Sequence, residues 1–472
     1  MRRRAAVLFG LFLAAGCATA PKYVRPETVS PPAYSEAGDW KPARPSAEVP
    51  RGPWWEVFGD PQLNDLEARV DGASPTLRAA QARFDQARAL VRYASAARWP
   101  QVAGTAAVSR TDHSENTPNW GAGSAEHYWD YLLQVDASYE VDVWGRVRAG
   151  VAASRAAAQA SAADVESVRL SLHAELAADY FALRATDAER DLLRSSVAAY
   201  EKALELTENR YKGGVATAVD VAQARAQLES TRAQLVDLEA LRAQIEHALA
   251  TLVGQTPGTV KPEPMPLAGD PPVIPPGLPA DLLERRPDVA AAERRVAEAN
   301  AQIGVASSAF YPAIALTASG GFESSALKDL LKGVSGFWTA GPAAAITLLD
   351  GGRRRAVSAQ ARAAFDEAVA RYQSTTLDAL REVEDQLVTL RVLDEEATVQ
   401  QAAVAAADRS LELSNNRYRG GIATYLEVVV AQNAALANRR VAANILARRF
   451  SASVLLIKAL GGGWDRGPGT TH

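Results

Sequence analysis

Cysteine is almost missing from this chain of 472 residues, which contains a single one, Cys17. One thiol excludes a disulfide framework and leaves too few ligands for a cysteine-based zinc site. Histidine is scarce as well: the chain has 5 histidines, far apart, without a His-x-x-x-His or Glu-x-x-His cluster. We therefore expect no metal site and no cofactor.

An excess of positive charge is also missing. The formal charge is −4, and 22% of the residues are charged, with the two signs interleaved. This balance excludes the basic stripe that binds nucleic-acid phosphates, so we expect no nucleic-acid partner. There is no phosphate-binding loop either, because Gly461-Gly462-Gly463 follows a helix end and does not join a strand to a helix. Most carboxylates alternate with Arg or Lys, as on solvated helix faces, and we expect no enzyme activity.

Long hydrophobic runs are confined to the start of the chain. The apolar run from Ala5 to Ala15 is about half the ~20 residues that a spanning helix needs. It follows three arginines and precedes Cys17, a pattern that indicates a secretory signal. We expect residues 1–16 to be removed and Cys17 to be lipidated; an ordinary signal peptide with a nearby cysteine is the alternative. If the mature protein crosses a membrane, it must use strands.

Proline divides the rest of the chain. Residues 17–73 are dotted with proline and predict an N-terminal anchor and an extended lead-in, with one short packed segment at residues 54–61. Nine of the 25 prolines lie in residues 257–279, so we interpret residues 257–280 as a connector. The connector separates two structural repeats, residues 74–256 and 281–461, and residues 462–472 form a C-terminal tail.

The first repeat begins with a helix at Ser74-Pro75, where serine is a cap and proline suits the first turn. This helix runs to residue 98, and strands are expected at 101–109 and 129–143. In the second strand every odd position from Trp129 to Val143 is apolar, which gives the strand one apolar and one polar face. Its length suffices for a tilted membrane-spanning strand with a polar lumen face.

A very long helix follows the strands. Residues 145–212 are rich in Ala, Leu, Glu, Gln and Arg and would span roughly 100 Å as a helix. A bend at Gly213-Gly214 and a returning helix to about residue 253 complete the repeat.

The second repeat follows the same order. Arg286-Pro287 opens a helix that ends near Pro312, strands are expected at 313–323 and 337–349, and a second long helix follows. Only Pro342 conflicts with a strand, and an edge or bulge position would accommodate it. Four spanning strands cannot close, because known barrels of this kind have at least about eight. We therefore expect several copies to share their strands.

The clearest repeated motif lies at the two bends. Residues 209–217 read Asn-Arg-Tyr-Lys-Gly-Gly-Val-Ala-Thr, and residues 416–424 read Asn-Arg-Tyr-Arg-Gly-Gly-Ile-Ala-Thr. Gly213 and Gly420 are predicted to be the left-handed residues past each helix end, while Arg210 and Arg417 place positive charge near its negative end.

Capping boxes are predicted after each bend. Thr217-x-x-Asp220 and Thr424-x-x-Glu427 have the spacing of a hydroxyl cap and a reciprocal acid. Ending and capping helices is a sufficient local role for the acids, and a functional role is the alternative.

Several motifs in order resemble those of TolC/NodT-type outer-membrane efflux lipoproteins. The resemblance covers nearly the whole mature chain and rests on these residues: Trp55 to Leu63, Val143-Trp144-Gly145-Arg146, Leu283 to Val289, Ala292-Glu293, Ala299-Asn300, Ile303-Gly304, Ala306, Asp350-Gly351-Gly352-Arg353 and the two Arg-Tyr-x-Gly-Gly bends. It implies an α+β membrane protein, internally duplicated and trimeric. Four strands per chain would form a shared 12-stranded outer-membrane β-barrel that continues into a long periplasmic α-helical barrel.

The resemblance also implies a function and partners. The homotrimer would sit in outer-membrane lipid as a lipid-anchored duct that reaches into the periplasm. A periplasmic adaptor would join it to an inner-membrane pump, most commonly of the proton-driven resistance-nodulation-division (RND) type, and small molecules such as drugs would leave passively. A type I protein-secretion duct and a structural coiled-coil lipoprotein without a pore remain alternatives.

The resemblance assigns the bends to the periplasmic end of the duct. The adaptor-docking residues are then Arg210, Tyr211, Gly213, Gly214, Val215, Arg417, Tyr418, Gly420, Gly421 and Ile422. Asp220 and Glu427 would be the acids of an aperture. Ala423 and Thr424 occupy tip positions where such ducts can carry an acid.

Overall fold

The computed structural model describes residues 21–27, 31, 34–35, 52–112, 127–274 and 285–462. The predicted signal peptide and Cys17 lie outside these residues. So do the last part of the proline-rich connector, the start of the Leu283 to Val289 motif and most of the C-terminal tail.

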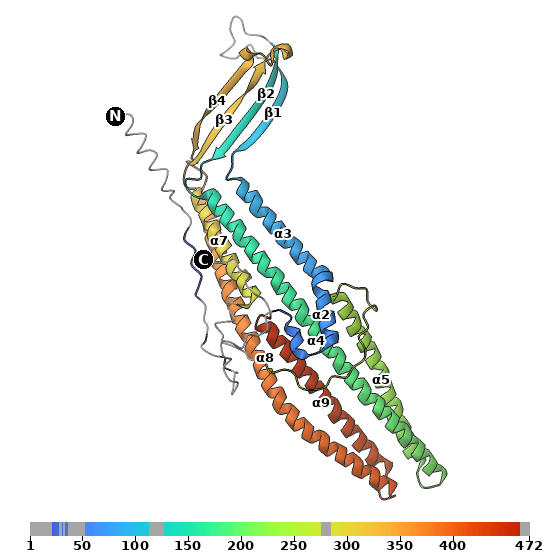
Figure 1. Cartoon of the computed structure of the whole chain (residues 1–472). Coiled ribbons are helices and arrows are strands. Elements are labelled where there is room, and N and C mark those ends of the chain that lie inside the picture. The colour runs from blue at the N-terminus through green and yellow to red at the C-terminus, as the bar shows by residue number, and fades with distance from the viewer. Residues whose placement is uncertain are drawn as a thin grey trace. The chain divides into compact units, whose positions relative to one another are not determined.

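The first repeat contains two strands between helices (Figure 1). It is preceded by η2 (Trp54–Phe58) and α2 (Pro61–Ala73), and its elements are α3 (Pro75–Ala96), β1 (Gln101–Asp112), β2 (His127–Glu140), α4 (Arg146–Lys212) and α5 (Ala218–Leu252). The second repeat consists of α7 (Pro287–Ser308), β3 (Ala313–Ser324), η3 (Leu327–Asp329), η4 (Gly333–Ser335), β4 (Gly336–Ala345), α8 (Arg353–Arg419) and α9 (Tyr425–Ala459). The two long helices have 67 residues each and the returning helices 35 each, so the duplication is confirmed.

Helix α2 was not expected, because residues 17–73 predicted an extended lead-in. Asp60 begins the helix by accepting hydrogen bonds from the backbone N–H groups of Gln62 and Leu63. Pro61 occupies the first turn, where its missing N–H costs nothing, so this proline starts a helix instead of breaking one. Leu63, Leu66 and Val70 recur at helical spacing and are buried.

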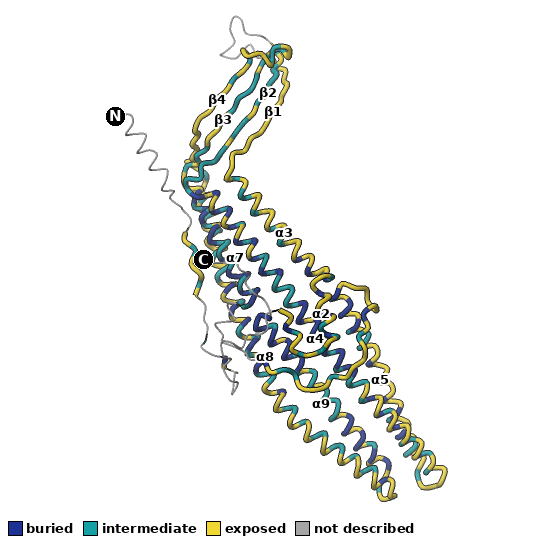
Figure 2. Tube along the Cα trace, viewed as in Figure 1, coloured by how far each residue is buried: buried dark blue, intermediate teal, exposed yellow. Residues whose placement is uncertain are grey.

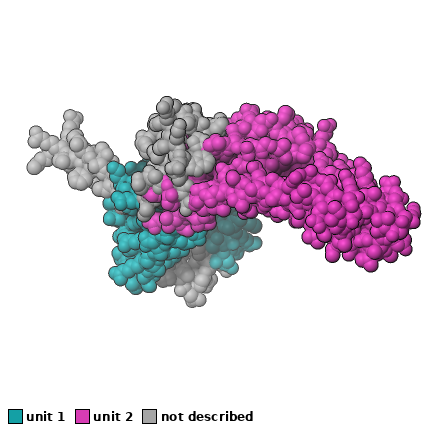
Figure 3. Space-filling view, turned by 90° about the horizontal axis from the view of Figure 1, so that it is seen from below, with its two compact units in different colours: residues 1–27, 83–162, 291–372 teal, residues 28–82, 163–290, 373–472 magenta. Residues whose placement is uncertain are grey.

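The described chain divides into two compact units, each built from segments of both repeats (Figure 3). The first unit, residues 1–27, 83–162 and 291–372, contains a four-stranded sheet in the order β1-β2-β3-β4, with each neighbouring pair antiparallel. Strands β1 and β4 are therefore the edges of the sheet in one chain. Pro342 lies on the edge strand β4 opposite Leu316, where it does not interrupt an inner ladder.

Two strands end earlier than their patterns predicted. Strand β2 stops at Glu140 because Asp142 accepts hydrogen bonds from the N–H groups of Val147 and Arg148 and thereby begins α4. Strand β4 ends at Ala345, four residues before the predicted 349.

The strands meet the helices at an aromatic joint in the first unit. The ring of Trp144 stacks on Tyr311, with centroids 4.7 Å apart, and its indole N–H donates to the Pro312 carbonyl at 2.8 Å. Trp144 precedes α4, whereas Tyr311 and Pro312 join α7 to β3. This contact connects the strand-to-helix joint of the first repeat with the helix-to-strand joint of the second.

The second unit, residues 28–82, 163–290 and 373–472, closes each repeat on itself. Gly254, just past α5, has φ +67°, and a Cβ there would lie 2.3 Å from the carbonyl oxygen of Ala73. Gly461, just past α9, has φ +90°, and its Cβ would lie 3.0 Å from the carbonyl oxygen of Arg285. The residue past each returning helix thus lies against the chain at the start of its own repeat or just before it.

None of the helices in the described residues carries an apolar stretch long enough to cross a membrane.

Candidate functional site

The first candidate bend lies between α4 and α5. The N–H of Val215 donates to the Arg210 carbonyl at 2.8 Å, and the N–H of Gly214 donates to the Tyr211 carbonyl at 2.9 Å. These are the two hydrogen bonds of a Schellman ending, in which the residue just past the helix cap is left-handed. That residue is Gly214, with φ +75°.

The second bend, between α8 and α9, has the same geometry. The N–H of Ile422 donates to the Arg417 carbonyl and that of Gly421 to the Tyr418 carbonyl, both at 3.0 Å, and Gly421 has φ +76°. The prediction that Gly213 and Gly420 are the left-handed residues was therefore wrong by one position. Both are caps with ordinary φ values, because Schellman hydrogen bonding puts the strained conformation one residue later.

The two predicted capping boxes have different outcomes. Thr217 receives a hydrogen bond from the Asp220 N–H at 3.2 Å, and the Asp220 carboxylate accepts the Thr217 N–H at 2.8 Å, so this box is confirmed. Thr424 makes no side-chain cap, and the box at the second bend was wrong. Glu427 lies instead 3.7 Å from the guanidinium of Arg417, a contact that draws its carboxylate away from the cap.

The bends pack against each other through Tyr418. Its side chain is 6% exposed and joins a buried cluster with Ala224, Tyr425 and Val428. The rings of Tyr418 and Tyr425 meet edge to face, 5.3 Å apart, and the Tyr418 hydroxyl donates to Thr207 at 3.3 Å. Burial, with the neighbouring phenols of Tyr418 and Tyr200, raises the pKa of Tyr425 to about 12, so its hydroxyl stays neutral.

Arg210 connects the first bend to the second. Its guanidinium carbon lies 4.5 Å from the centre of the Tyr418 ring, and Nη1 donates to the Tyr418 carbonyl at 2.7 Å. Arg210 therefore satisfies a carbonyl at the end of α8, where positive charge is favourable, and stacks on an aromatic face at the same time. The prediction had placed this charge at the end of its own helix, α4.

The matching tyrosines of the two bends have different environments. Tyr211 is 50% exposed, whereas Tyr418 is buried. The two copies of the motif therefore place one tyrosine ring outward and the other inward. Of these two rings, the inward one, Tyr418, contacts both hairpins.

Exposed aliphatic side chains occupy equivalent places in both hairpins. Val215 and Val219 follow the first bend and are 69% and 63% exposed, and Ile422 and Leu426 follow the second and are 75% and 52% exposed. Val215 and Ile422 lie in the bends themselves, and Val219 and Leu426 lie in the first turns of the returning helices. A shallow groove continues along α5, lined by Ala218, Val221, Ala222, Arg225, Ala226 and Glu229. Exposed apolar side chains that gather in one place, as these do at the bends, mark interaction surfaces.

Further up the same unit, side chains that the sequence analysis missed bind the two hairpins together. Gln227 donates to Asn433 at 2.8 Å, and Arg440 donates to Glu189 at 2.6 Å and to Gln234 at 3.0 Å. Leu193, Leu238 and Leu436 form a buried cluster from α4, α5 and α9. Figure 2 shows this burial on the inner side of α9, while the bends remain exposed. The polar residues of these contacts belong to no repeated motif, so no local signal singled them out, whereas Leu193 and Leu238 stand at the helical spacing of apolar residues that the sequence shows.

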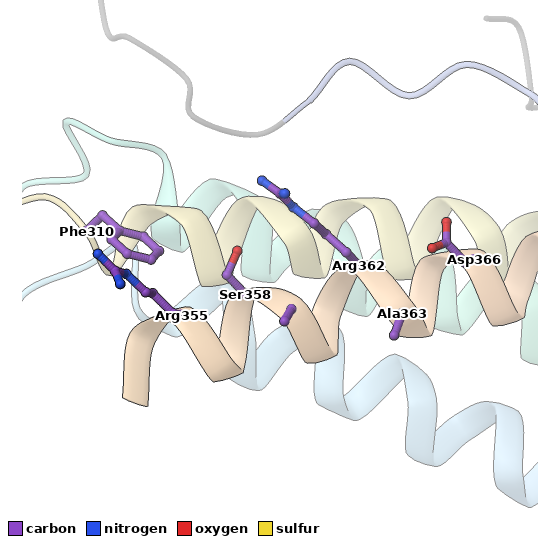
Figure 4. A pocket seen from close by; sticks show the side chains of 7 residues that line it. Phe310, Arg355, Ser358, Arg362, Ala363 and Asp366 are labelled. Atoms are coloured by element: carbon purple, nitrogen blue, oxygen red, sulfur yellow. The ribbon is translucent and has the colours of Figure 1, made fainter. Parts of the chain in front are cut away.

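A second concavity lies in the first unit and is less suited to bind a small molecule. Phe310 and one face of α8 line it, with Arg355, Ser358, Arg362 and Asp366 along that face (Figure 4). Ligand sites normally enclose their ligand between several elements, and this groove has one helix face and one ring. In the described part of the chain, no group of three or more His, Cys, Asp or Glu residues is placed to hold a metal ion.

Comparisons with known proteins agree on one family. The model of the outer membrane efflux protein family matches residues 69–255 and 278–462. The chain is 33% identical over 467 residues to the probable efflux pump outer membrane protein SepC and to the toluene efflux pump outer membrane protein TtgF, both of Pseudomonas putida. These alignments cover 95% of this chain and 95% of each relative. The solved structure of the outer-membrane channel OprN matches with a TM-score of 0.88 and 30% identity, over 94% of this chain and 99% of that chain.

Proposed function

The chain belongs to the outer membrane efflux protein family and is the outer-membrane channel of an efflux system, and on this premise we propose that its two bends are the surface that docks the periplasmic adaptor. The observation that carries the proposal is the pair of Schellman bends packed side by side, with equivalent aliphatic residues exposed on both. A surface that exists only to turn the chain would not need four exposed aliphatic side chains there.

Closure of the channel requires other copies of the chain. In one chain β1 and β4 are edges, and an unpaired edge cannot face lipid. Three copies of the four-stranded sheet supply 12 strands, which is enough to close a barrel. Trp129, Leu133 and Val135 on β2 are exposed in the chain, as side chains that face lipid are. The homotrimer and the continuation of its barrel into α-helices are part of this proposal, and the match to the outer-membrane channel OprN supports them.

The ends of the channel have different partners in this proposal. Cys17 carries a lipid anchor in the outer membrane, after removal of residues 1–16. The long helices, α4 and α8, carry the bends into the periplasm, each over about 100 Å of helix. The adaptor joins them to an inner-membrane pump of the RND type. The pump provides the energy, so the channel itself carries out no catalysis.

The substrates are small molecules, including drugs. The name of one relative, TtgF, refers to toluene efflux, which favours apolar solvents as one class of cargo. The structural repeats, residues 74–256 and 281–461, each contribute two strands and one bend. The family resemblance implies in addition that the connector at 257–280, the N-terminal segment and the C-terminus would form a belt around the middle of the helices.

The acids near the bends have local partners in addition to the aperture role assigned to them. The carboxylate of Asp220 is engaged by Thr217, and Glu427 lies beside Arg417. In a trimer three copies of each would still add negative charge around the duct. We propose that they narrow it electrostatically in addition to their local roles.

Conductance of the purified protein in planar bilayers tests both the channel and the acids. The intact protein is expected to form passive channels, because strand closure leaves a polar lumen. Asp220→Ala combined with Glu427→Ala is expected to raise the single-channel conductance, and Asp220→Asn, which removes one charge but keeps the side-chain shape, should raise it as well. A protein that forms no channels would be a coiled-helix scaffold. Equal conductance of the intact and alanine proteins would leave the acids with local roles only.

A further inference from the structure

The groove that Phe310 and one face of α8 form in the first unit, which we call the junction groove, carries positive charge that the chain does not neutralise. Its arginines, Arg355 and Arg362, are exposed, and among the residues that the structure describes no acid forms an ion pair with either. The neighbouring Arg354 is different, because it pairs with Asp350 at 2.7 Å and its guanidinium carbon lies 5.7 Å from the centre of the Phe310 ring.

The side chains of the junction groove converge toward its Phe310 end (Figure 4). Arg355 lies beside Phe310, and Arg362 is directed toward the same end and away from Asp366. This direction is the usual one, because side chains on a helix tilt toward its N-terminus. Ser358 adds a hydroxyl between the two arginines. Planar guanidinium groups match the oxygens of a phosphate, so the chemistry of the groove favours a phosphate group as its ligand.

The junction groove lies where the strands meet the helices. Strand β3 begins three residues after Phe310, and α8 begins eight residues after the end of β4. The short connection from β4 to α8 contains exposed aliphatic side chains, 51%, 86% and 90% exposed in chain order: Ile346, Leu348 and Leu349. Apolar residues followed at once by arginines are expected where a chain leaves the hydrocarbon of a bilayer and enters its headgroup layer. In the proposed channel this level is the periplasmic surface of the outer membrane.

A second copy of the chain cannot neutralise these arginines. Closing the strands pairs the edge β4 with the edge β1 of the next copy, which brings the end of α3 in that copy toward the start of α8. Residues 83–98 contain four arginines and one acid, Asp85, which already lies 3.9 Å from Arg88. The next copy therefore adds positive charge. Like charges repel, so an anion between the two helices would stabilise the seam.

We propose that the junction groove binds the headgroup of an anionic glycerophospholipid from the periplasmic leaflet of the outer membrane. Arg355 and Arg362 donate to its phosphate oxygens, and Phe310 packs against its glycerol. The inference rests on the proposed function for the placement of the strands in the membrane. A shallow groove is sufficient for a lipid because the bilayer retains the acyl chains, whereas a free small ligand needs a site that encloses it.

Native mass spectrometry of the purified full-length protein tests the ligand. The trimer is released from micelles that contain phosphatidylglycerol and phosphatidylcholine with the same acyl chains. It is expected to retain phosphatidylglycerol about tenfold more tightly, because the arginines repel the choline ammonium. Inorganic phosphate in excess should not displace the lipid. Equal retention of the two lipids would overturn the anionic headgroup as ligand, and displacement by inorganic phosphate would overturn the lipid as its source.

Replacing the arginines tests the site. Arg355→Gln combined with Arg362→Gln is expected to lower the retention of phosphatidylglycerol at least about tenfold, because charge-assisted hydrogen bonds are lost. The control, Arg371→Gln combined with Arg381→Gln, changes two exposed arginines of α8 that pair with Glu367 and Asp378, and it should bind like the unmodified protein. Unchanged retention by the first variant would overturn the proposal.

The state of the trimer distinguishes the lipid from a contact between copies. Loss of trimers in the glutamine variant on an unheated gel, with unchanged retention of lipid, would assign the arginines to the seam itself and overturn the lipid site. If the glutamine variant forms no trimers at all, Arg355→Lys combined with Arg362→Lys replaces it. This variant keeps the charge but loses the guanidinium fork, and it should lower retention severalfold. Retention equal to that of the unmodified protein would then overturn the proposal.

Conductance in planar bilayers separates this inference from the proposed function. The glutamine variant is expected to form channels of unchanged conductance, because the headgroup lies at the bilayer surface. Absence of channels from the unmodified protein would refute the channel, and the retention of phosphatidylglycerol would still test the junction groove.

Discussion

Valine at both Gly214 and Gly421 is expected to lower drug resistance of the cell to that of a strain without this protein. Both glycines are left-handed, at φ +75° and +76°, and lie at the centre of the Schellman endings. A left-handed residue with a side chain costs roughly 1–2 kcal/mol, and β-branching raises the cost. The bends would rearrange, and the exposed Val215 and Ile422 beside them would move.

The expected defect is local to docking. A Cβ at Gly214 meets no atom within 4 Å, and a Cβ at Gly421 meets only the end of the Arg210 side chain, at 3.8 Å. Trimers should therefore still form, which gel electrophoresis without heating would detect. The matched control is alanine at Gly213 and Gly420, whose φ values are ordinary and whose nearest contacts lie at 3.4 Å or more. Normal export by the valine variant would mean that the bends only turn the chain.

Alanine at Gly321 is expected to abolish assembly in the outer membrane. Gly321 lies in β3 opposite Gln134 of β2 and Phe337 of β4, inside the sheet. A Cβ there would lie 2.1 Å from the Leu133 carbonyl oxygen and 2.8 Å from the Gln134 Cα. Both atoms belong to the backbone, so no side-chain rotation can move them away from the new Cβ. The expected cost exceeds the roughly 1–3 kcal/mol of ordinary overpacking.

Two neighbouring glycines provide a graded series for the same measurement. A Cβ at Gly320 would make contacts of 3.4 Å, and one at Gly341, on the edge strand β4, would meet nothing within 4 Å of the chain. The fraction of protein found as trimer in the outer membrane should therefore fall from Gly341→Ala to Gly320→Ala to Gly321→Ala. Equal assembly of all three variants would show that the sheet does not form with this register.

The long elements were predictable because their signals are local and repeated. The helix expected at 145–212 is observed as α4 at Arg146–Lys212, and the alternating residues from Trp129 to Tyr139 lie in β2. Helix α2 was missed because Pro61 was interpreted as part of a lead-in, although Asp60 before it is a cap. A proline has opposite meanings in the first turn of a helix and inside it, and the preceding residue decides between them.

The bends show where repetition misleads. Their sequences are nearly identical, yet Tyr211 is exposed and Tyr418 is buried, and only Thr217 caps its helix. These differences arise where the two hairpins pack on each other, since only one ring can fill the space between them. A motif predicts backbone conformation well because the hydrogen bonds are local. It cannot predict which copy faces inward, because that depends on residues far away in the sequence.

The position of the N-terminal segment, residues 21–27, on α7 could not be predicted from the sequence for the same reason. Its contacts join residues 270 or more positions apart, such as Tyr23 with Glu293 and Pro21 with Asn300. The motif on α7 marked Glu293 and Asn300 as distinctive, but nothing near them in the sequence indicates an extended segment as the partner.

Site-specific photo-crosslinking at the bends tests the docking proposal most directly. A photoreactive residue is placed at Val215 or Ile422 in cells that contain the complete efflux system, and at Val399 as an equally exposed control on α8. Crosslinks to the periplasmic adaptor are expected from Val215 and Ile422, and none is expected from Val399. Adaptor crosslinks that are absent from both bends, or are as strong from Val399, would contradict the docking proposal.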